Sequence, residues 1–241
     1  MAHTNEKIIL VTGGARGLGE AICAALSCAD HSILIADVNY EKAQKVAERL
    51  GEKGGRSKAY PVDLSSEESI DKLMNTVREE FGRLDVLINN AGTDITKPIT
   101  EMATEEWDRV LAVNLRAPFL TCRHALRMME EREQGHIINI ISTAALRGWT
   151  EASAYHASKW GLRGFTQALF TEARRKGIKV TGLIAGGMKT PFLLERFPDI
   201  DLTTLQDPEN VASAIQFIIS RSDDSCIPEM MVIPMQETSW P

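Results

Sequence analysis

The sequence predicts a single α/β domain with a doubly wound parallel sheet that carries helices on both faces. Short β-rich segments alternate with longer helical patterns along nearly the whole chain, which is typical of stacked β-α-β units. Several strand segments are continuously apolar, as expected for strands that are covered on both faces. No repeat or linker interrupts the pattern, so residues 1–241 are expected to form one domain.

The predicted strands are Ile8–Thr12, Ser32–Asp37, Ser57–Val62, Leu84–Asn89, His136–Ile141, Ile178–Ile184 and Met230–Ile233. The predicted helices are Leu18–Ala29, Glu41–Lys53, Glu67–Phe81, Thr104–Glu133 (expected as two helices), Ala154–Lys176 and Pro208–Ser220. One long segment, Thr190–Asp207, has no clear periodicity and follows a predicted strand. Loops at that end of a parallel sheet usually form the ligand crevice.

The composition excludes several classes of protein. The chain is 44% hydrophobic and 25% charged, and its net charge of −6 gives no reason to expect nucleic acid or an anionic membrane as partner. The four cysteines have no metal-ligand spacing, so we expect free thiols in a reducing compartment and no metal site. Neither a signal core nor a membrane-spanning apolar run occurs, and a cytoplasmic location is expected.

A glycine-rich turn, Thr12-Gly-Gly-Ala-Arg-Gly-Leu-Gly19, lies between the first predicted strand and a helix. Glycines at 13, 17 and 19 allow a tight turn, close approach to a pyrophosphate and close packing of the helix. The helix N-terminus offers N–H groups to the phosphates. Alone, this GxxxGxG spacing is equally consistent with a plain structural turn, but its position after a strand favours nucleotide binding.

Asp37 ends the second predicted strand, where an acidic residue commonly binds the adenosine ribose hydroxyls. The alternative is a turn aspartate that caps the next helix. A carboxylate at this place repels a 2′-phosphate, so Asp37 favours NAD. Arg16 in the glycine-rich turn could instead pair with a 2′-phosphate, which makes NADP the alternative cofactor.

Tyr155 and Lys159 are four positions apart in a predicted helix and share one face. A free tyrosine has a pKa of about 10, too high for acid–base chemistry at neutral pH, and a nearby ammonium is expected to lower it. Alone, such a pair is usually a surface coincidence. Ser142 follows the strand His136–Ile141, and a short connection could bring its hydroxyl to the phenol.

Further motifs of the chain are Asp63-Leu64, Asn89-Asn-Ala-Gly92 and Val113-Asn114. In order and spacing, the whole set resembles the single-domain short-chain dehydrogenase/reductases over almost the full length. The resemblance implies a Rossmann-type fold and transfer of a hydride between a nicotinamide cofactor and a ketone or secondary alcohol. The substrate would be a small molecule of the 3-oxoacyl type or of the sugar or polyol type.

The resemblance also implies residue roles. Tyr155 would be the general acid/base and Ser142 would hold the substrate oxygen. Lys159 would bind the nicotinamide ribose and tune Tyr155, while Asn114 would seat a water in a proton relay. The implied cofactor-binding residues are Gly13, Arg16, Gly17, Leu18, Gly19, Asp37, Asp63, Leu64, Asn90, Ala91, Gly92, Tyr155, Lys159, Met188 and Thr190.

The chain departs from the family pattern after its sixth predicted strand, where Ala185-Gly186 replaces the usual Pro-Gly. Without the proline, this turn is expected to be less preorganised. The segment from Phe192 to Gln206 is shorter than the usual lid and predicts an open cleft, lined partly by Met188, Phe192 and Leu193. His156 is interpreted as a packing or interface residue.

Two classes of function stay open: an enzyme, and a non-catalytic nucleotide-binding redox sensor with the same fold. Retention of Asn114, Ser142, Tyr155 and Lys159 together favours the enzyme. The resemblance further implies a homo-oligomer, most often a tetramer, built through helices that correspond to Arg116–Glu133 and Ala154–Lys176.

Overall fold

One sheet of seven parallel strands organises the computed structural model, which describes residues 6–237. The strand order is β3-β2-β1-β4-β5-β6-β7. The strands are β1 (Lys7–Thr12), β2 (His31–Asp37), β3 (Arg56–Pro61), β4 (Val86–Asn89), β5 (Gly135–Ser142), β6 (Ile178–Ala185) and β7 (Glu229–Val232). The predicted parallel sheet is therefore confirmed.

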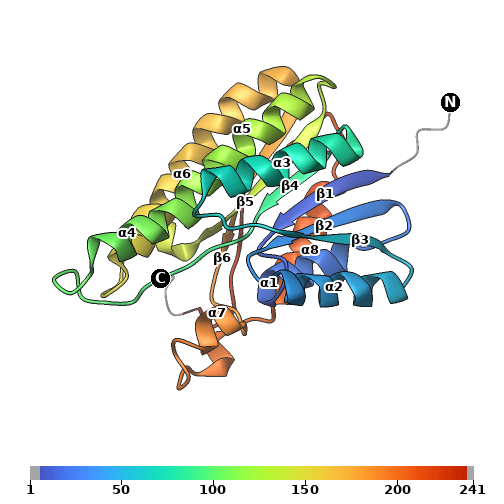
Figure 1. Ribbon diagram of the computed structural model, residues 1–241. Coiled ribbons are helices and arrows are strands. Elements are labelled where there is room, and N and C mark those ends of the chain that lie inside the picture. The colour runs from blue at the N-terminus through green and yellow to red at the C-terminus, as the bar shows by residue number, and fades with distance from the viewer. Residues whose placement is uncertain (1–5, 238–241) are drawn as a thin grey trace.

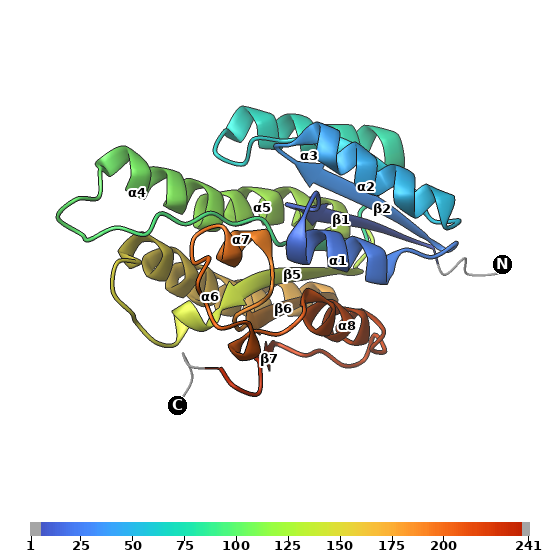
Figure 2. The same ribbon diagram turned by 90° about the horizontal axis from the view of Figure 1, so that it is seen from below.

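Helices cover both faces of this sheet (Figures 1 and 2). One face carries α1 (Gly17–Leu26), α2 (Tyr40–Glu52) and α8 (Pro208–Ile219). The other carries α3 (Glu67–Phe81), α5 (Ala117–Glu130) and α6 (Ser153–Ala173), and α4 (Thr104–Leu111) extends the line of α5 beyond the sheet. The doubly wound arrangement expected from the sequence is confirmed.

Two apolar layers lie on opposite faces of the central strands. Ile9 and Val11 of β1 pack toward α1, whereas Leu10 packs toward α3 and α5. Successive side chains of a strand point to opposite faces, so a strand that is buried on both faces needs apolar residues at every position. This explains the continuous apolar runs in the sequence.

The two helices predicted over Thr104–Glu133 are confirmed as α4 and α5, which follow one another without a break. A π-helical turn, Ala112–Arg116, joins α4 to α5, and its residue Asn114 is fully buried. Such wide turns occur often at functional sites because they re-aim a side chain. A residue pattern with a period near 3.6 does not reveal the extra residue in this turn, so the sequence did not predict the π-helical turn.

The segment without periodicity, Thr190–Asp207, is ordered by short elements. It holds α7 (Pro191–Leu194) and a 3₁₀ turn, Leu202–Thr204. A bridge between Met188 and Gln206 ties its two ends together. In Figure 2, α7 lies across the sheet's carboxyl end, beside the point where the chain leaves β5 and β6.

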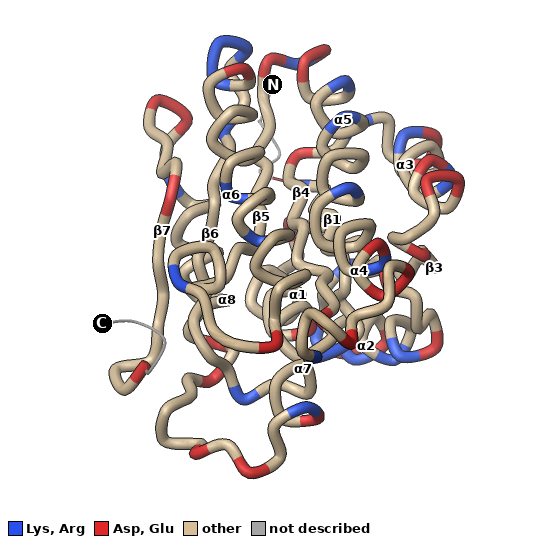
Figure 3. Tube along the Cα trace, turned by 90° about the vertical axis from the view of Figure 1, so that its left-hand side faces the viewer, with Lys and Arg blue, Asp and Glu red and all other residues tan. Residues whose placement is uncertain are grey.

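Charges of both signs are interspersed over the helices and loops that the structure describes (Figure 3). Within residues 6–237, no helix is long and apolar enough to cross a membrane. In the same part of the chain, no three His, Cys, Asp or Glu side chains gather as metal ligands would.

Candidate active site

The glycine-rich turn after β1 meets the turn after β4, where the strand order changes direction. Asn90 Nδ2 donates to the carbonyl oxygens of Thr12 and Gly13, at 2.9 and 3.0 Å. Thr12 Oγ1 in turn accepts from the backbone N–H groups of Asn90 and Ala91, at 3.1 and 3.2 Å. These bonds build the crevice at the topological switch point, where open α/β sheets bind ligands.

The glycine-rich turn requires glycine at specific positions. Gly13 has φ +65°, and a Cβ there would lie 2.8 Å from the Cα of Ala91. Gly17 has φ +56°, and a Cβ on Gly19 would overlap the carbonyl oxygen of Gly13. Bare backbone therefore lines the approach to the N-terminus of α1. This cradle fits a dinucleotide pyrophosphate, which needs close contact with backbone N–H groups.

Asp37 turns its carboxylate toward the glycine-rich turn. Its Oδ2 accepts from the N–H of Ala15 at 3.1 Å, and its Oδ1 accepts from the N–H of Asn39 at 2.9 Å. The next helix is capped by Asn39, whose side chain accepts from Lys42 N, so Asp37 is not the N-cap of α2. The carboxylate is thus held at the carboxyl end of β2, where a ribose would lie.

Asp63 and Leu64 lie after β3, on the same side of the crevice. Asp63 Oδ1 accepts from both the N–H and the hydroxyl of Ser65, at 2.9 and 2.7 Å. These hydrogen bonds hold the pKa of Asp63 below its ordinary value, so it is ionised at neutral pH. Leu64 is half-buried. Contact of either residue with an adenine stays a prediction.

Arg16 forms an ion pair that crosses the crevice. Its Nη1 lies 2.8 and 3.0 Å from the two carboxylate oxygens of Glu195, directly after α7. Both side chains are exposed, so the pair contributes little to stability. The sequence suggested the Arg16 guanidinium as a partner for a 2′-phosphate. In the structure it is paired with Glu195, directly after α7.

Ser142, Tyr155 and Lys159 come together at the carboxyl end of β5. Tyr155 and Lys159 lie one turn apart on α6 and are 9% and 4% exposed. Lys159 Nζ donates to the carbonyl oxygen of Ile140 at 2.9 Å and lies 5.7 Å from the centroid of the Tyr155 ring. The hydroxyl of Ser142 also accepts from the N–H of Ala144, which fixes its position.

Burial dominates the electrostatics of this pair. It raises the pKa of Tyr155 to about 12, against an opposing hydrogen bond with Ser142. It also lowers the pKa of Lys159 to about 8, because an ammonium loses its hydration. The expectation that Lys159 lowers the pKa of Tyr155 is wrong for the protein alone: desolvation of the phenolate outweighs every nearby positive charge.

Asn114 connects the π-helical turn to the chain that follows β4. Its Oδ1 accepts from Thr93 N at 2.8 Å, and its Nδ2 donates to Thr93 O at 2.8 Å and to Ser158 Oγ at 3.0 Å. A Cβ on Gly92 would lie 3.5 Å from Asn114 Oδ1 and 3.8 Å from Lys159 Nζ. The side-chain amide therefore holds a loop at the site, and its role toward a relay water stays a prediction.

The turn after β6 is held by the carboxyl-terminal part of the chain. Gly186 N donates to Val232 O at 3.0 Å, and Gly187 N donates to Glu237 Oε2 at 2.9 Å. A Cβ on Gly186 would lie 2.8 Å from Pro234 Cδ. A carboxylate 50 positions along the chain thus ties the turn that lacks the proline, and the expected loss of preorganisation stays a prediction.

Met188 and Thr190 continue from this turn toward the glycine-rich turn. Thr190 is buried, and its Cβ would lie 3.3 Å from a Cβ built on Gly17. Met188 is half-buried and pairs with Gln206. Thr190 thus lies beside the glycine-rich turn, and contact of either residue with a cofactor stays a prediction.

Comparison with known proteins identifies the family of this chain. A sequence profile described as short chain dehydrogenase matches residues 7–201. The chain belongs to the short-chain dehydrogenase/reductase family. It is 32% identical over 235 residues to an uncharacterized oxidoreductase of Staphylococcus aureus (strain N315). The aligned region covers 98% of this chain and 100% of the relative. It is also 32% identical to the uncharacterized oxidoreductase YxjF of Bacillus subtilis (strain 168), over 88% of this chain and 82% of the relative.

Solved structures of other oxidoreductases are similar over nearly the whole chain. A metagenomic short-chain oxidoreductase in complex with NADP has a TM-score of 0.85 and 31% identity, and covers 95% of this chain and 97% of its own. A variant of actinorhodin polyketide ketoreductase with NADPH has a TM-score of 0.90 and 28% identity, and covers 99% of this chain and 100% of its own.

In this short-chain dehydrogenase/reductase, three further side chains border the site. Arg196 Nη1 lies 2.5 Å from Asp94 Oδ2, and its guanidinium stacks 3.9 Å from the Phe192 ring centroid. Phe192 in turn packs 5.9 Å from the Tyr155 ring centroid. Phe192 was expected in the cleft, but Asp94 and Arg196 were missed. A charged residue two positions after the Asn-Asn-Ala-Gly motif was the available signal.

His156 has a structural place beside the site. Its Nδ1 lies 2.7 Å from the carbonyl oxygen of Ala144, and its Nε2 accepts from the backbone N–H of Trp149 at 3.1 Å. The imidazole therefore bridges the loop between β5 and α6. This geometry agrees with a packing role.

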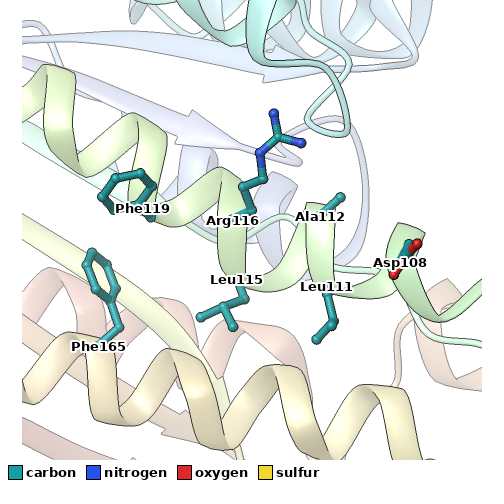
Figure 4. Close-up of a pocket in the computed structure, with 7 residues that line it drawn as sticks. All are labelled: Asp108, Leu111, Ala112, Leu115, Arg116, Phe119 and Phe165. Carbon is teal, nitrogen blue, oxygen red and sulfur yellow. The ribbon is translucent and has the colours of Figure 1, made fainter.

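An open groove of about 640 Å³ runs along α4, the π-helical turn and α6, and includes none of the four residues implied in catalysis. Leu111 and Leu115 project from one wall toward α6, and Phe119 meets Phe165 edge-on with 6.2 Å between ring centroids (Figure 4). Its lining is Asp108, Leu111, Ala112, Leu115, Arg116, Phe119 and Phe165.

Proposed function

We propose that this short-chain dehydrogenase/reductase transfers a hydride between a nicotinamide dinucleotide and a ketone or secondary alcohol, with Tyr155 as the general acid/base. The observation that carries the proposal is the buried Tyr155 hydroxyl, hydrogen-bonded with Ser142 and one helical turn from Lys159. A surface coincidence would leave these side chains in solvent. Their joint burial at the carboxyl end of β5 is what proton transfer in a water-poor site requires.

The bound dinucleotide would supply or accept the hydride, and the protein's own residues would move the proton. Reduction of a carbonyl leaves an alkoxide, to which Tyr155 would donate its phenolic proton while the Ser142 hydroxyl positions the oxygen. Because burial raises the pKa of Tyr155 to about 12, the phenol is protonated at neutral pH and ready to donate. Oxidation would need a lower pKa, which the cationic ring of the oxidised cofactor favours.

The observed cradle supports a dinucleotide in an extended crevice. The backbone N–H groups of Gly17, Leu18 and Gly19, the first residues of α1, would bind the pyrophosphate. Asp37 would bind the adenosine ribose, and Lys159 the nicotinamide ribose. The remaining residues of the crevice, Asp63, Leu64, Asn90, Ala91, Gly92, Met188 and Thr190, would line the two rings.

NAD is proposed as the preferred cofactor, because the Asp37 carboxylate would repel a 2′-phosphate. Solved relatives are described with NADP or NADPH, so the preference needs a direct test. We expect kcat/KM with NADH to exceed that with NADPH at least ~10-fold, and the Asp37→Ala variant to lose this discrimination. Equal or higher efficiency of the unmodified protein with NADPH would overturn the assignment.

The reaction itself is tested with a panel of ketones and alcohols, followed by nicotinamide absorbance. Tyr155→Phe should keep cofactor affinity and lose rate by roughly 10² to 10⁴ on the best substrate. Near-native turnover by this variant would refute the role of Tyr155. Cofactor binding without turnover on any carbonyl would favour the alternative, a redox sensor.

A homo-oligomer, most often a tetramer, is proposed from the face formed by α5 and α6. Phe119 of α5 and Trp160 of α6 are 45% and 51% exposed, and Phe119 lines the apolar groove in Figure 4. Exposed apolar surface of this kind is typical of subunit contacts. Light scattering at micromolar concentration should give a multiple of the chain mass of 26.6 kDa, and a monomeric mass would contradict the proposal.

A further inference from the structure

A buried carboxylate next to the catalytic residues has one oxygen without a hydrogen-bond partner. The Asp94 side chain is only 7% exposed. Its Oδ2 is paired with Arg196, whereas Oδ1 is buried and unpartnered. Buried polar atoms in native proteins almost always have partners, so an orphaned carboxylate oxygen indicates a ligand group that the protein is built to receive.

Asp94 lies close to the residues implied in catalysis. Asp94 is two residues after Gly92, in the turn that follows β4. Its ion-pair partner Arg196 stacks on Phe192, which packs against the ring of Tyr155. Asp94 and Arg196 are both close enough to Tyr155 to act on its pKa, which the carboxylate raises and the guanidinium lowers. Phe192 belongs to α7, which lies over the carboxyl end of the sheet in Figure 2.

Other unpartnered oxygens gather in the same corner. Among residues 6–237, four buried side-chain nitrogen or oxygen atoms lack a partner, and three of them are Asp94 Oδ1, Thr96 Oγ1 and Ser153 Oγ. Thr96 and Ser153 belong to two segments joined by the hydrogen bond from Lys97 N to Glu151 O at 2.8 Å. Three of the four atoms therefore belong to two neighbouring segments, the turn after β4 and the start of α6.

We propose that Asp94 determines substrate specificity by accepting a hydrogen bond from a hydroxyl group of the substrate at Oδ1. The enzyme would then prefer hydroxylated ketones, and the corresponding polyols, over 3-oxoacyl and keto-acid substrates. This inference rests on the proposed function and names its substrate class.

The charges of Asp94 and Arg196 favour a substrate with a neutral hydroxyl group over an anionic substrate. An ionised carboxylate only accepts hydrogen bonds, so it matches a donor such as an alcohol O–H. Arg196 is already neutralised by Asp94 and buried against Phe192, so its charge is not free for a substrate carboxylate. A substrate anion would also meet the Asp94 charge at close range.

The test compares two ketones that differ by one group: 1-hydroxy-2-butanone and 3-pentanone, in which a methyl replaces the hydroxyl. With unmodified enzyme, kcat/KM should be about 10- to 100-fold higher for the hydroxyketone, the usual effect of a hydrogen bond to a charged group. Asp94→Leu should bring this ratio close to 1, because any change that loss of the Asp94 charge causes at Tyr155 affects both ketones alike and cancels in the ratio. Turnover of 3-pentanone reports that the variant is folded and binds cofactor.

Glu195→Gln serves as the matched control, since it removes the neighbouring ion pair on the same segment and should leave the ratio unchanged. Asp94→Asn keeps the shape and one acceptor and should give an intermediate ratio. Equal efficiency of the unmodified enzyme on both ketones, an unchanged ratio in Asp94→Leu, or a preference for acetoacetate would overturn the proposal. Absence of turnover on every carbonyl would instead overturn the proposed function itself.

Discussion

Lys159 lowers the stability of the folded protein, and the size of this penalty depends on pH. The side chain is 4% exposed, and burial lowers its pKa from 10.5 to about 8. Between these two values the unfolded chain binds more protons than the folded chain, so the free energy of unfolding rises with pH through this window. At 1.36 kcal/mol per pKa unit, the penalty is about 3 kcal/mol at pH 7 and about 1.4 kcal/mol at pH 9.5.

Lys159→Met removes the buried charge and keeps a long side chain. It also removes the hydrogen bond to Ile140 O, which is worth about 1 kcal/mol at any pH. We expect the variant to be more stable than the unmodified protein by about 2 kcal/mol at pH 7, although it loses activity. This advantage should shrink by about 2 kcal/mol between pH 7 and 9.5.

Urea unfolding without dinucleotide, measured at several pH values, gives the difference between the two proteins. The pKa values of the buried thiols Cys23 and Cys122 are raised by burial and would change stability in alkaline solution. They are present in both proteins, so their contribution cancels in the difference. Lys72→Met, at an exposed position of α3, is the control and should show no pH-dependent advantage. A difference for Lys159→Met that does not vary with pH would refute the reasoning.

Three further predictions concern the framework of the site. Asn114→Ala should lower the free energy of unfolding by about 2–4 kcal/mol in urea, because buried loop groups lose partners, whereas exposed Asn210→Ala should change it by under ~0.5 kcal/mol. Glu237→Ala should weaken cofactor binding roughly 10-fold in a fluorescence titration, since the freed turn must be ordered on binding; an unchanged Kd would contradict this. Gly13→Ala should cost about 1–3 kcal/mol at its positive φ, whereas Gly148→Ala, which meets open space, should be nearly neutral by thermal unfolding.

Local patterns were sufficient to predict the sheet and to select the residues that meet at its carboxyl end. Alternation of apolar strands and amphipathic helices reflects burial at each element, which is a property of the nearby sequence. Ser142 and Tyr155 could be placed together because one follows a strand and the other begins the next helix. The glycine-rich turn after β1 and the acidic residue at the end of β2 could likewise be placed, because each directly follows or ends a predicted strand.

Other features depend on contacts between distant parts of the chain and were not predictable. Arg196 and Asp94 are 102 positions apart, and nothing in either neighbourhood indicates the pairing. Burial raises the pKa of Tyr155, whereas the sequence predicted that the neighbouring Lys159 would lower it. Burial depends on every element packed around Tyr155, so it could not be predicted from the local sequence. The π-helical turn at Asn114 was missed because one inserted residue hardly alters an apolar pattern.

The tie between Gly187 and Glu237 has a consequence for biosynthesis. A chain leaves the ribosome from its N-terminus, and these two residues are 50 positions apart. Every strand from β1 to β6 and the helix bearing Tyr155 can therefore be made while the turn after β6 is still untied. Domains fold as units late in synthesis, and a product cut short before Glu237 would have all the reactive side chains without the carboxylate that closes the turn around them.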